Sequence, residues 1–436
     1  MLGVSVDQWK PEGPRWGALF ALVVAGETVF FLPFVLARVF RPTFLEVFGL
    51  TNFQLGTAFA LYGVVAMLSY FPGGVLADLL SPRKLLALAL VATSGGGLLL
   101  ASIPSLSSLK LLYAYWGFTT VALFWAALMR ATREWGGLTR QGAAFGLLDG
   151  GRGLLTAATA VVLVVLYASL IPDEAASATL EQRSAAFRRI IAVTAAMTVL
   201  AAVPVWFFLP RRSDSLPRER SGFEFRGVAQ ILAMPTVWLQ AFIVICAYVG
   251  FKATDDFSLY AHEVLGLDEV KASKAGAVSL WVRPFAAIAA GFLADRFSAG
   301  LMTIFSFVLL LLGSLLLAAD IIHTGMLGLY LLAVIGASLG IFALRGLYYA
   351  IMQEGKVPLA FTGSAVGMVS VVGYTPDIFM GPVMGYLLDE FPGPLGHQRV
   401  FLVVAGFALA GLAASAVFHG WSFKDRSRGK GIKGEA

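Results

Sequence analysis

Nine charged side chains interrupt the long apolar runs of this 436-residue sequence. A charged group surrounded by hydrocarbon costs roughly 2.5–3.5 kcal/mol on insertion scales, so such side chains face a cavity or one another. Guanidinium and ammonium groups bind anions there, and carboxylates exchange protons. The basic members are Arg152, Lys252, Arg283 and Arg345. The acidic members are Glu27, Asp149, Asp255, Asp256 and Asp377.

The segment SLWVRPF places Arg283 near the middle of an apolar run. Arg283 precedes Asp295 by twelve residues, which is about 18 Å along a helix. Pro284 removes a backbone donor and favours a kink there. Once the other cations are paired locally, Arg283 is the one left most nearly free, so we predict that it binds an anionic substrate group, with Trp281 and Tyr248. The alternative is a structural ion pair between helices.

Two other cations have carboxylates one helical turn away. Asp149 and Arg152 are three residues apart, so Arg152 is either a substrate contact or half of a local ion pair. Lys252 is also a candidate substrate contact. It can pair with Asp255 or Asp256, which leaves one carboxylate unmatched and able to take up a proton. We predict proton coupling at Asp149, Asp255 and Asp256. The alternative for the last two is that they face an external vestibule.

Glu27 lies about eleven residues into the first apolar run, with no basic residue within a turn or two. It is therefore either a further proton-coupling site or the partner of a cation on another helix, such as Arg152 or Arg283. Charged residues nearer the ends of the runs are predicted to form gates or latches between helices. These are Asp78, Arg83, Asp295, Arg296, Arg345 and Asp377.

The composition identifies lipid as the surroundings of these groups. Hydrophobic residues make up 58% of the chain and charged residues 13%, with a mean hydropathy of +0.81. Soluble domains carry about 25% charged residues. Continuous apolar runs of about 20 residues predict an all-α membrane protein with twelve transmembrane helices and exclude a barrel of short alternating strands. The runs lie near 16–40, 53–79, 84–103, 108–131, 141–170, 189–209, 236–262, 272–296, 300–322, 326–349, 359–388 and 400–420.

A charged stretch, Arg211 to Gly227, separates six runs from six. It predicts an N-terminal bundle over 1–210, a cytoplasmic linker over 211–230, and a C-terminal bundle over 231–436 that ends in a basic tail. With both termini inside, basic residues favour the inner loops about two to one, with Arg38 and Arg41 counted in the outer loops. This bias is expected for an inner membrane protein with cytoplasmic termini. The net charge of +6 then needs no nucleic-acid partner to explain it.

An internal repeat relates the two halves. EVFGL at Glu46 to Leu50 recurs as EVLGL at Glu263 to Leu267, and GVLAD at Gly74 to Asp78 recurs as GFLAD at Gly291 to Asp295. Both matches have an offset of 217 residues. Two parallel six-helix repeats predict pseudo-symmetric bundles with a substrate cavity between them near the middle of the membrane.

The segment GVLADLLSPRK, Gly74 to Lys84, resembles the loop signature G-x-x-x-D-R-x-G-R-R of the major facilitator superfamily, and GFLADRFS, Gly291 to Ser298, resembles its second copy. The resemblance covers nearly the whole chain and implies a transporter of that fold. Leu79 and Ser81 depart from the signature in the first copy, and Ser298 departs from it in the second.

Two further segments are similar to organic-anion and organophosphate transporters of this superfamily. They are RQGAAFGLLDGGRG, Arg140 to Gly153, and GYTPDIFMGPVMGYLLD, Gly373 to Asp389. Drug/proton antiporters carry an Arg ahead of a Gly in the fourth span, where this chain has Ala114, and a Gly-Pro motif in the fifth span that this chain lacks. The resemblance therefore favours an anion transporter over a drug exporter.

We accordingly expect a secondary transporter that moves a small organic anion by alternating access, coupled to protons. Efflux of a cationic or amphipathic compound, with Glu27 and the acids of the seventh run as receptors, is the alternative, and a transport-inactive membrane sensor is a more remote one. The four histidines form no cluster with metal-ligand spacing, so we expect no enzyme, metal or cofactor. The expected partners are a small-molecule substrate, protons and the lipid bilayer, and the chain is expected to be a monomer.

Overall fold

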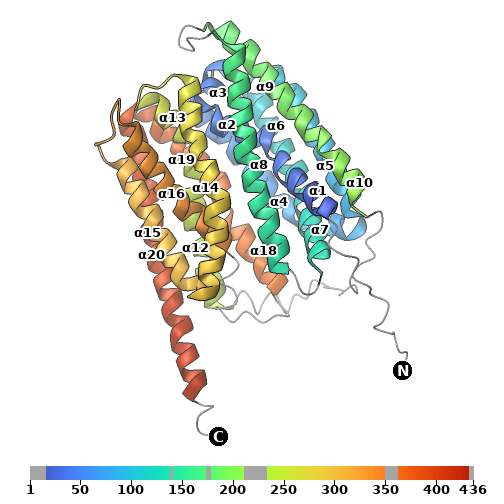
Figure 1. Cartoon of the computed structure of the whole chain (residues 1–436), viewed down its shortest axis with the longest axis vertical. Helices are drawn as coiled ribbons and strands as arrows, with labels where there is room; N and C mark the ends of the chain where they lie inside the picture. Colours follow the sequence, from blue (N-terminus) through green and yellow to red (C-terminus); the bar gives the residue numbers. More distant parts are fainter. Residues whose placement is uncertain (1–15, 138–140, 173–177, 211–232, 349–361, 432–436) are drawn as a thin grey trace.

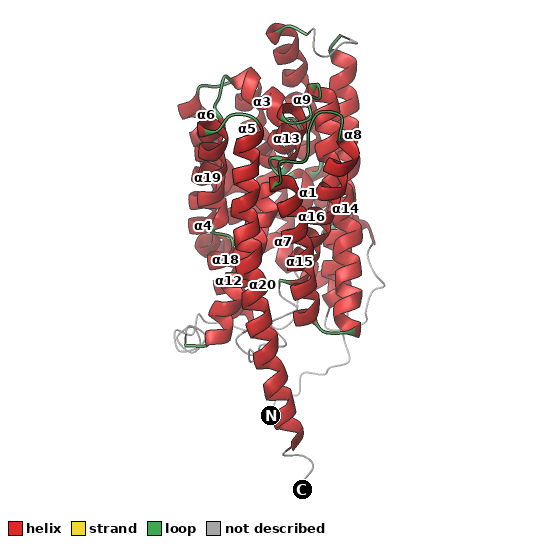
Figure 2. Ribbon diagram, turned by 90° about the vertical axis from the view of Figure 1, so that its left-hand side faces the viewer, coloured by secondary structure: helices red, strands yellow, loops and turns green. Residues whose placement is uncertain are grey.

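The computed structural model describes residues 16–137, 141–172, 178–210, 233–348 and 362–431, and the regular elements in these ranges are helices (Figures 1 and 2). The predicted linker, 211–230, lies outside the described residues. Eleven stretches in the described part are long and apolar enough to span a membrane. They agree with the predicted all-α membrane class.

The first half contributes helices α1 to α10, which pack side by side (Figure 1). Their bounds are α1 Trp16–Thr28, η2 Phe31–Val35, α2 Leu36–Val39, α3 Arg41–Phe48, α4 Asn52–Leu79, α5 Pro82–Ala101, α6 Leu106–Thr120, η3 Val121–Trp125, α7 Ala126–Gly136, α8 Gln141–Leu170, α9 Leu180–Leu200 and α10 Ala202–Phe208.

The second half contributes α12 to α20, of which α20 projects past its neighbours toward the C-terminus (Figure 1). The bounds are α12 Pro235–Ala253, α13 Phe257–Glu263, α14 Glu269–Arg296, α15 Ala299–Ala318, α16 Leu327–Leu347, α18 Thr362–Gly373, α19 Pro376–Glu390 and α20 Pro394–Gly431.

The predicted run at 359–388 is divided into α18 and α19, each shorter than a membrane span. Pro376 begins α19, and the residue before a proline is disfavoured in a continuing helix. The predicted run at 236–262 is divided in the same way at Thr254 to Asp256. Both interruptions lie beside charged residues, at Asp255 and Asp256 in one case and Asp377 in the other. Irregular backbone is tolerated within a membrane protein where the chain lines a cavity or is buried in protein.

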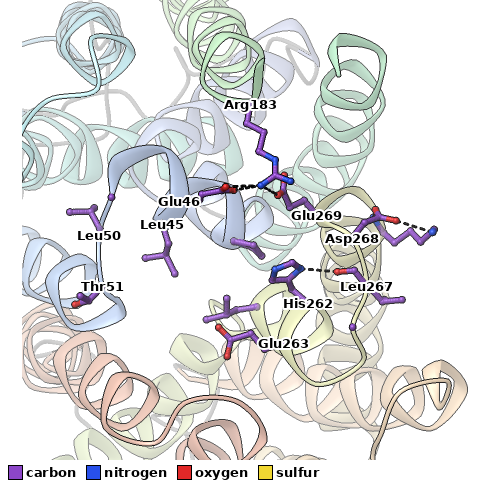
Figure 3. Close-up of a pocket in the computed structure, with 15 residues that line it drawn as sticks. Leu45, Glu46, Leu50, Thr51, Arg183, His262, Glu263, Leu267, Asp268 and Glu269 are labelled. Atoms are coloured by element: carbon purple, nitrogen blue, oxygen red, sulfur yellow. Dashed lines mark hydrogen bonds and ion pairs between the residues drawn. The ribbon is translucent and has the colours of Figure 1, made fainter. Parts of the chain in front are cut away.

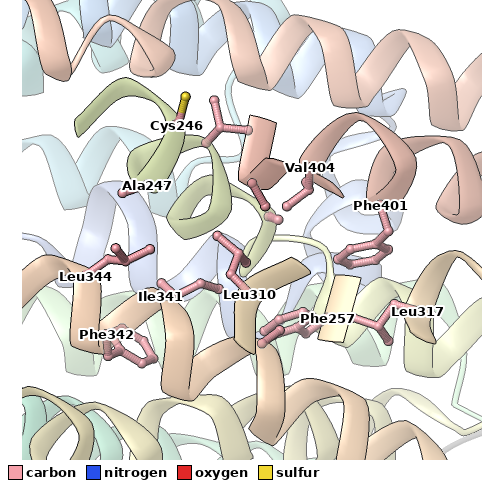
Figure 4. Close-up of a cluster of buried hydrophobic side chains, with 14 of the residues drawn as sticks. Cys246, Ala247, Phe257, Leu310, Leu317, Ile341, Phe342, Leu344, Phe401 and Val404 are labelled. Carbon is pink, nitrogen blue, oxygen red and sulfur yellow. The ribbon is translucent and has the colours of Figure 1, made fainter. Parts of the chain in front are cut away.

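Each half has its own buried apolar core. In the second half, Cys246 on α12, Phe257 on α13 and Phe401 on α20 point into one cluster (Figure 4). The rings of Phe257 and Phe401 stack with their centres 6.1 Å apart. In the first half, a comparable cluster includes Phe40, Phe187 and Trp116. These cores make each bundle a packed unit.

The two bundles approach each other most closely along α4 and α19. A methyl group added at Gly56 of α4 would lie 2.2 Å from the carbonyl oxygen of Gly381 on α19, and one added at Gly385 would lie 2.5 Å from that of Asn52. Such distances exclude any side chain, so glycine allows the two backbones to touch.

A series of hydrogen bonds and ion pairs runs from the middle of the molecule to the end that carries α3 and α13, at the top of Figure 1. At the very end, the backbone N–H groups of Asn52 and Phe53 donate to the Asp389 carboxylate of the other bundle, at 2.9 and 2.8 Å. The structure therefore has the α3/α13 end closed.

Candidate functional site

A central cavity of about 130 Å³ lies between the bundles. In the first half, two helical stretches contain a π-helical turn, η2 and η3. Phe34 of η2 and Trp125 of η3 both line the cavity. Local π-helical turns of this kind occur often at functional sites. Aromatic rings form much of the wall: Phe30, Phe34, Tyr62, Tyr70, Trp125, Tyr248, Phe251 and Tyr374. The basic residues in the wall are Arg38, Arg152, Lys252, Arg283 and Arg345, and the acids are Glu27 and Asp377.

Four of the predicted residues, one on α1, two on α8 and one on α14, meet in the middle of the molecule as the central charge cluster. Glu27 accepts from Arg152 Nε at 3.0 Å and from Arg283 Nη1 at 3.1 Å. Asp149 accepts from Arg283 Nη2 at 3.0 Å and lies 3.7 Å from Arg152 Nη1. The hydroxyl of Thr156 also donates to Glu27. Two guanidinium groups thus balance two carboxylates.

The central charge cluster corrects one expectation. Arg283 is not the free cation of the site, because it bridges Glu27 and Asp149 across the two bundles, and only its Nε is buried without a partner in the described part. The second reading of Glu27, as the partner of Arg152 and Arg283, is the one that the contacts show. Removing one member of such a buried network leaves an uncompensated charge, so the cluster holds the bundles together at mid-depth.

A second group of charges, the upper charge cluster, lies between the middle and the α3/α13 end. Asp255 accepts from Arg38 Nε at 2.6 Å and lies 3.3 Å from Lys252 Nζ. Lys252 also lies 3.4 Å from Asp377, whose other oxygen accepts from the Tyr248 hydroxyl at 3.0 Å. Lys252 is therefore shared by Asp255, which joins it to the other bundle, and Asp377, which faces the cavity.

Arg345 has a different environment from the other cavity cations. Its guanidinium carbon lies 3.9 Å from the centre of the Phe251 ring, and its Nη1 is buried without a hydrogen-bond partner among the described residues. We expected Arg345 and Asp377 near the two faces of the membrane, as gate residues, but both line the cavity.

The remaining predicted residues lie away from the cavity wall. Trp281 is 40% exposed and Asp256 is fully buried. Neither residue lines the cavity. Arg83 stacks on Trp206 at 4.3 Å, and Arg296 is exposed beside Phe297. The side chains of the two signature carboxylates, Asp78 and Asp295, lie outside the described part of the structure.

A groove at the α3/α13 end is lined by residues of both bundles (Figure 3). Arg183 of α9 donates to Glu46 of α3 at 2.6 Å and lies 3.0 Å from Glu269 of α14, and we call these three residues the latch. Asp268, at the rim, pairs with Lys271 of its own helix. Although burial opposes it, hydrogen bonding by the side chain and backbone of Lys271 holds the pKa of Asp268 below its usual value.

Sequence reasoning missed Arg38 and Arg41, which we counted with the outer loops. Arg38 binds Asp255, and Arg41 is 3% exposed and donates to the Asp255 carbonyl at 3.2 Å. The internal repeat could have indicated the contact between Arg38 and Asp255, because these residues are separated by the same 217 positions as the repeated segments. Equivalent positions of two parallel repeats meet where they lie close to the pseudo-twofold axis.

Comparison with known proteins places this architecture in a family. Residues 18–374 match the family model of the Major Facilitator Superfamily. The chain is 24% identical over 413 residues to the inner membrane protein YqcE of Escherichia coli strain K12, covering 93% of this chain and 94% of that protein. It is also 24% identical to the inner membrane protein YihN of the same organism, covering 92% and 95%.

Solved structures of transporters share the fold. A crystal structure of the nucleoside transporter NupG superposes with a TM-score of 0.71 at 13% identity, covering 93% of this chain and 99% of that one. A bacterial homologue of the human lysosomal transporter Spinster, in an inward-facing and unoccupied conformation, gives 0.70 at 16% identity, covering 95% and 99%. With the family match over most of its length and this fold, the chain belongs to the major facilitator superfamily.

Proposed function

We propose that this protein is a secondary transporter that carries a small organic anion across the inner membrane by alternating access, coupled to protons, with both termini in the cytoplasm. The two bundles, the cavity between them and the closed α3/α13 end support alternating access. The charge bias of the loops supports the orientation. The nature of the cavity wall supports the class of substrate.

The observation that carries the proposal is the Nη1 atom of Arg345, which is buried without a hydrogen-bond partner among the described residues. The cavity cations number five, and the carboxylates that face or pair with them are Glu27, Asp149, Asp255 and Asp377. One positive charge is therefore in excess, and it belongs to the cation whose Nη1 has no partner in the described part. A buried donor of this kind is costly unless a ligand satisfies it, and a carboxylate or phosphate accepts from guanidinium with suitable geometry.

The aromatic side chains of the cavity wall indicate the shape and polarity of the rest of the ligand. Phe251 covers one face of the guanidinium, and Tyr374 and Tyr70 also line the cavity. A site with one free cation and an aromatic wall suits an anion that carries an apolar or ring-shaped body. The alternative of a cationic substrate is disfavoured by the contacts of its proposed receptors, because Glu27 and Asp255 are each paired with two cations.

Proton flux in proteoliposomes tests the proposal. The purified protein is reconstituted with a pH-sensitive dye inside, and matched probes are added outside: benzoate, benzyl alcohol, benzylamine, glycerol 3-phosphate and glycerol. We expect an anionic probe to change the internal pH, and we expect an uncoupler to abolish this pH change. The neutral counterpart of the probe should have no effect. A response to benzylamine alone would support cation efflux instead, and anion uptake unaffected by a pH gradient would reject proton coupling.

A further inference from the structure

A buried histidine outside the cavity joins two carboxylates. His397, at the start of α20, has no exposed surface. Its Nδ1 lies 2.8 Å from Asp256 Oδ2 and its Nε2 lies 3.1 Å from Glu263 Oε2. We call these three residues the histidine bridge. Asp256 precedes α13 and Glu263 ends it, so the bridge fixes both ends of this short helix to α20.

The two contacts require an additional proton. An ionised carboxylate only accepts hydrogen bonds, and a neutral imidazole has a single N–H to donate. Two short contacts from one ring to two carboxylates therefore need either an imidazolium or a protonated carboxyl. The histidine bridge thus holds one proton more than a neutral imidazole with two carboxylates would hold.

The groups around the bridge supply no competing cation in contact with it. The Tyr260 ring lies 5.1 Å from the imidazole, and the Tyr330 ring stacks on Tyr260. Asp320 accepts from Gln398, the neighbour of His397. Arg399 lies over the Phe391 ring, 3.3 Å from its centre. Asp256 Oδ1 is buried with no partner among the described residues, so the histidine proton is the main compensation for the charge of Asp256.

Glu263 connects the bridge to solvent. Glu263 is 32% exposed and lines the groove at the α3/α13 end, whereas the side chains of His397 and Asp256 are fully buried. Figure 3 shows the Glu263 side chain at this groove. A proton can therefore be exchanged with the medium on that side through Glu263, without passing through the central cavity.

The bridge is also attached to the contacts that close the α3/α13 end. Asp256 directly follows Asp255, which binds Arg38 of the other bundle at 2.6 Å. Ser258, in the first turn of α13, donates to the Arg38 carbonyl at 2.7 Å. The same short segment thus contacts His397 on one side and the opposite bundle on the other, so its position depends on both.

We propose that Asp256, Glu263 and His397 form a proton-binding site open to the groove, and that the proton bound there keeps the α3/α13 end closed. Loss of the proton leaves two carboxylates facing a ring that can donate to one of them. The segment from Asp255 to Ser258 then loses its attachment to α20, and its contacts with Arg38 weaken. Histidine is suited to this role because an imidazole can gain or lose its second proton, and the two carboxylates beside it favour the protonated form. The site acts without the anion, so it stands apart from the proposed transport.

Distances between spin labels test this proposal without any substrate. The labels are attached to Glu181→Cys on α9 and Lys274→Cys on α14, both exposed positions, in a Cys246→Ala background that removes the single native thiol. The double electron–electron resonance distance is recorded from about pH 6 to about pH 10.5, because the two carboxylates beside the imidazole stabilise its bound proton. We expect the longer distance to gain population as the pH rises, with the open-to-closed ratio changing by up to about tenfold per pH unit for one coupled proton.

Three variants decide the origin of this response. In His397→Gln the amide cannot bridge two carboxylates as an imidazolium does, so we expect the response to pH to vanish. In Glu263→Gln, an exposed change that spares the core, the midpoint should move to lower pH by about one unit or more, because one of the two charges that favour the proton is gone. His262→Gln, which alters a histidine that lines the groove without belonging to the bridge, should respond as the parent does.

The results that would overturn the proposal are equally specific. A parent protein whose distances do not change with pH would contradict it, as would a Glu263→Gln variant with an unaltered midpoint. A response retained in His397→Gln, or lost in His262→Gln, would assign the proton to another group. Absence of anion transport would leave these measurements unaffected, so the failure of one proposal is distinguishable from the failure of the other.

Discussion

Arg345 differs from the other basic residues of the cavity wall in having its Nη1 buried without a partner among the described residues. Arg283 shows the opposite situation, since it is held by Glu27 and Asp149 at 3.1 and 3.0 Å. At the scale of single residues, we therefore infer that Arg345 binds the anionic substrate and that Arg283 holds the two bundles together. The two assignments predict different outcomes for similar substitutions.

Substitution of Arg283 by alanine is expected to destabilise the protein. The change leaves the buried carboxylate of Glu27 with one fewer cation and Asp149 with its 3.7 Å contact to Arg152 alone. Loss of one partner of a buried ion pair costs about 3–5 kcal/mol. Thermal unfolding of the purified variant in detergent measures this cost. A melting temperature equal to that of the parent would contradict the assigned role.

Substitution of Arg345 by glutamine is expected to spare stability and to weaken anion binding. A hydrogen bond to a charged group contributes about 1.5–3 kcal/mol, so the dissociation constant should rise about tenfold to 100-fold. Equilibrium binding of the anionic probe that acts in proteoliposomes measures the change, with Trp281→Phe, outside the cavity wall, as the control. Equal affinity in parent and Arg345→Gln would exclude the guanidinium as a ligand group.

The sequence was sufficient to find the charged residues of the site but not their partners. The cost of charge in an apolar run identified Glu27, Arg152, Lys252 and Arg283 before any contact was known. Pairing between residues more than a turn apart depends on helix packing, which the pattern of one chain does not contain. For that reason Arg283 was predicted to be free, and Arg38 was counted as a loop residue although it contacts Asp255.

At the scale of helices, the site depends on local departures from regular α-helix. The turns η2 and η3 bring Phe34 and Trp125 into the cavity wall, and the break before Pro376 places Asp377 beside Lys252. The apolar runs predicted the helices and their approximate ends, because length and hydropathy determine a span. They did not predict the π-helical turns, since Pro33 alone marks one of them and no proline marks the other.

The contact between α4 and α19 gives a prediction at the same scale. Gly56→Ala places a methyl group against the Gly381 carbonyl, so the α3/α13 end should close less readily. Overpacking costs about 1–3 kcal/mol, which lowers the closed population relative to the open one by about fivefold or more. The spin-label distance between positions 181 and 274 reports this shift. Gly74→Ala, on the same helix with nothing within 4 Å of the added methyl, should behave as the parent does.

At the scale of the whole molecule, the closed end is held by charges from both bundles. Glu269 of α14 is 5% exposed and accepts from Arg183 and from the Tyr167 hydroxyl, both of the first half. Its neighbour Asp268 pairs with Lys271 on α14. Within the part of the chain that the structure describes, Asp268 has no ion pair with the other bundle. Two adjacent acids thus differ in whether they connect the bundles.

We therefore expect Glu269→Gln to shift the labelled protein toward the longer distance and Asp268→Asn to leave it unchanged. The first change removes the charge that Arg183 and Tyr167 contact, and a hydrogen bond to a charged group contributes about 1.5–3 kcal/mol. The open-to-closed ratio should rise about tenfold or more. Equal distance distributions in the two variants would mean that the latch does not hold this end closed.

The central claim is that the excess cation of the cavity binds an anion. Thermal stability of the purified protein against benzoate, glycerol 3-phosphate and their neutral and cationic counterparts tests it most directly, because a ligand that binds only the folded protein raises its melting temperature. The account predicts a rise with at least one of the anions, none with its uncharged counterpart, and loss of the rise in Arg345→Gln. Stabilisation by benzylamine or by the neutral probes instead, or a full rise in Arg345→Gln, would contradict it.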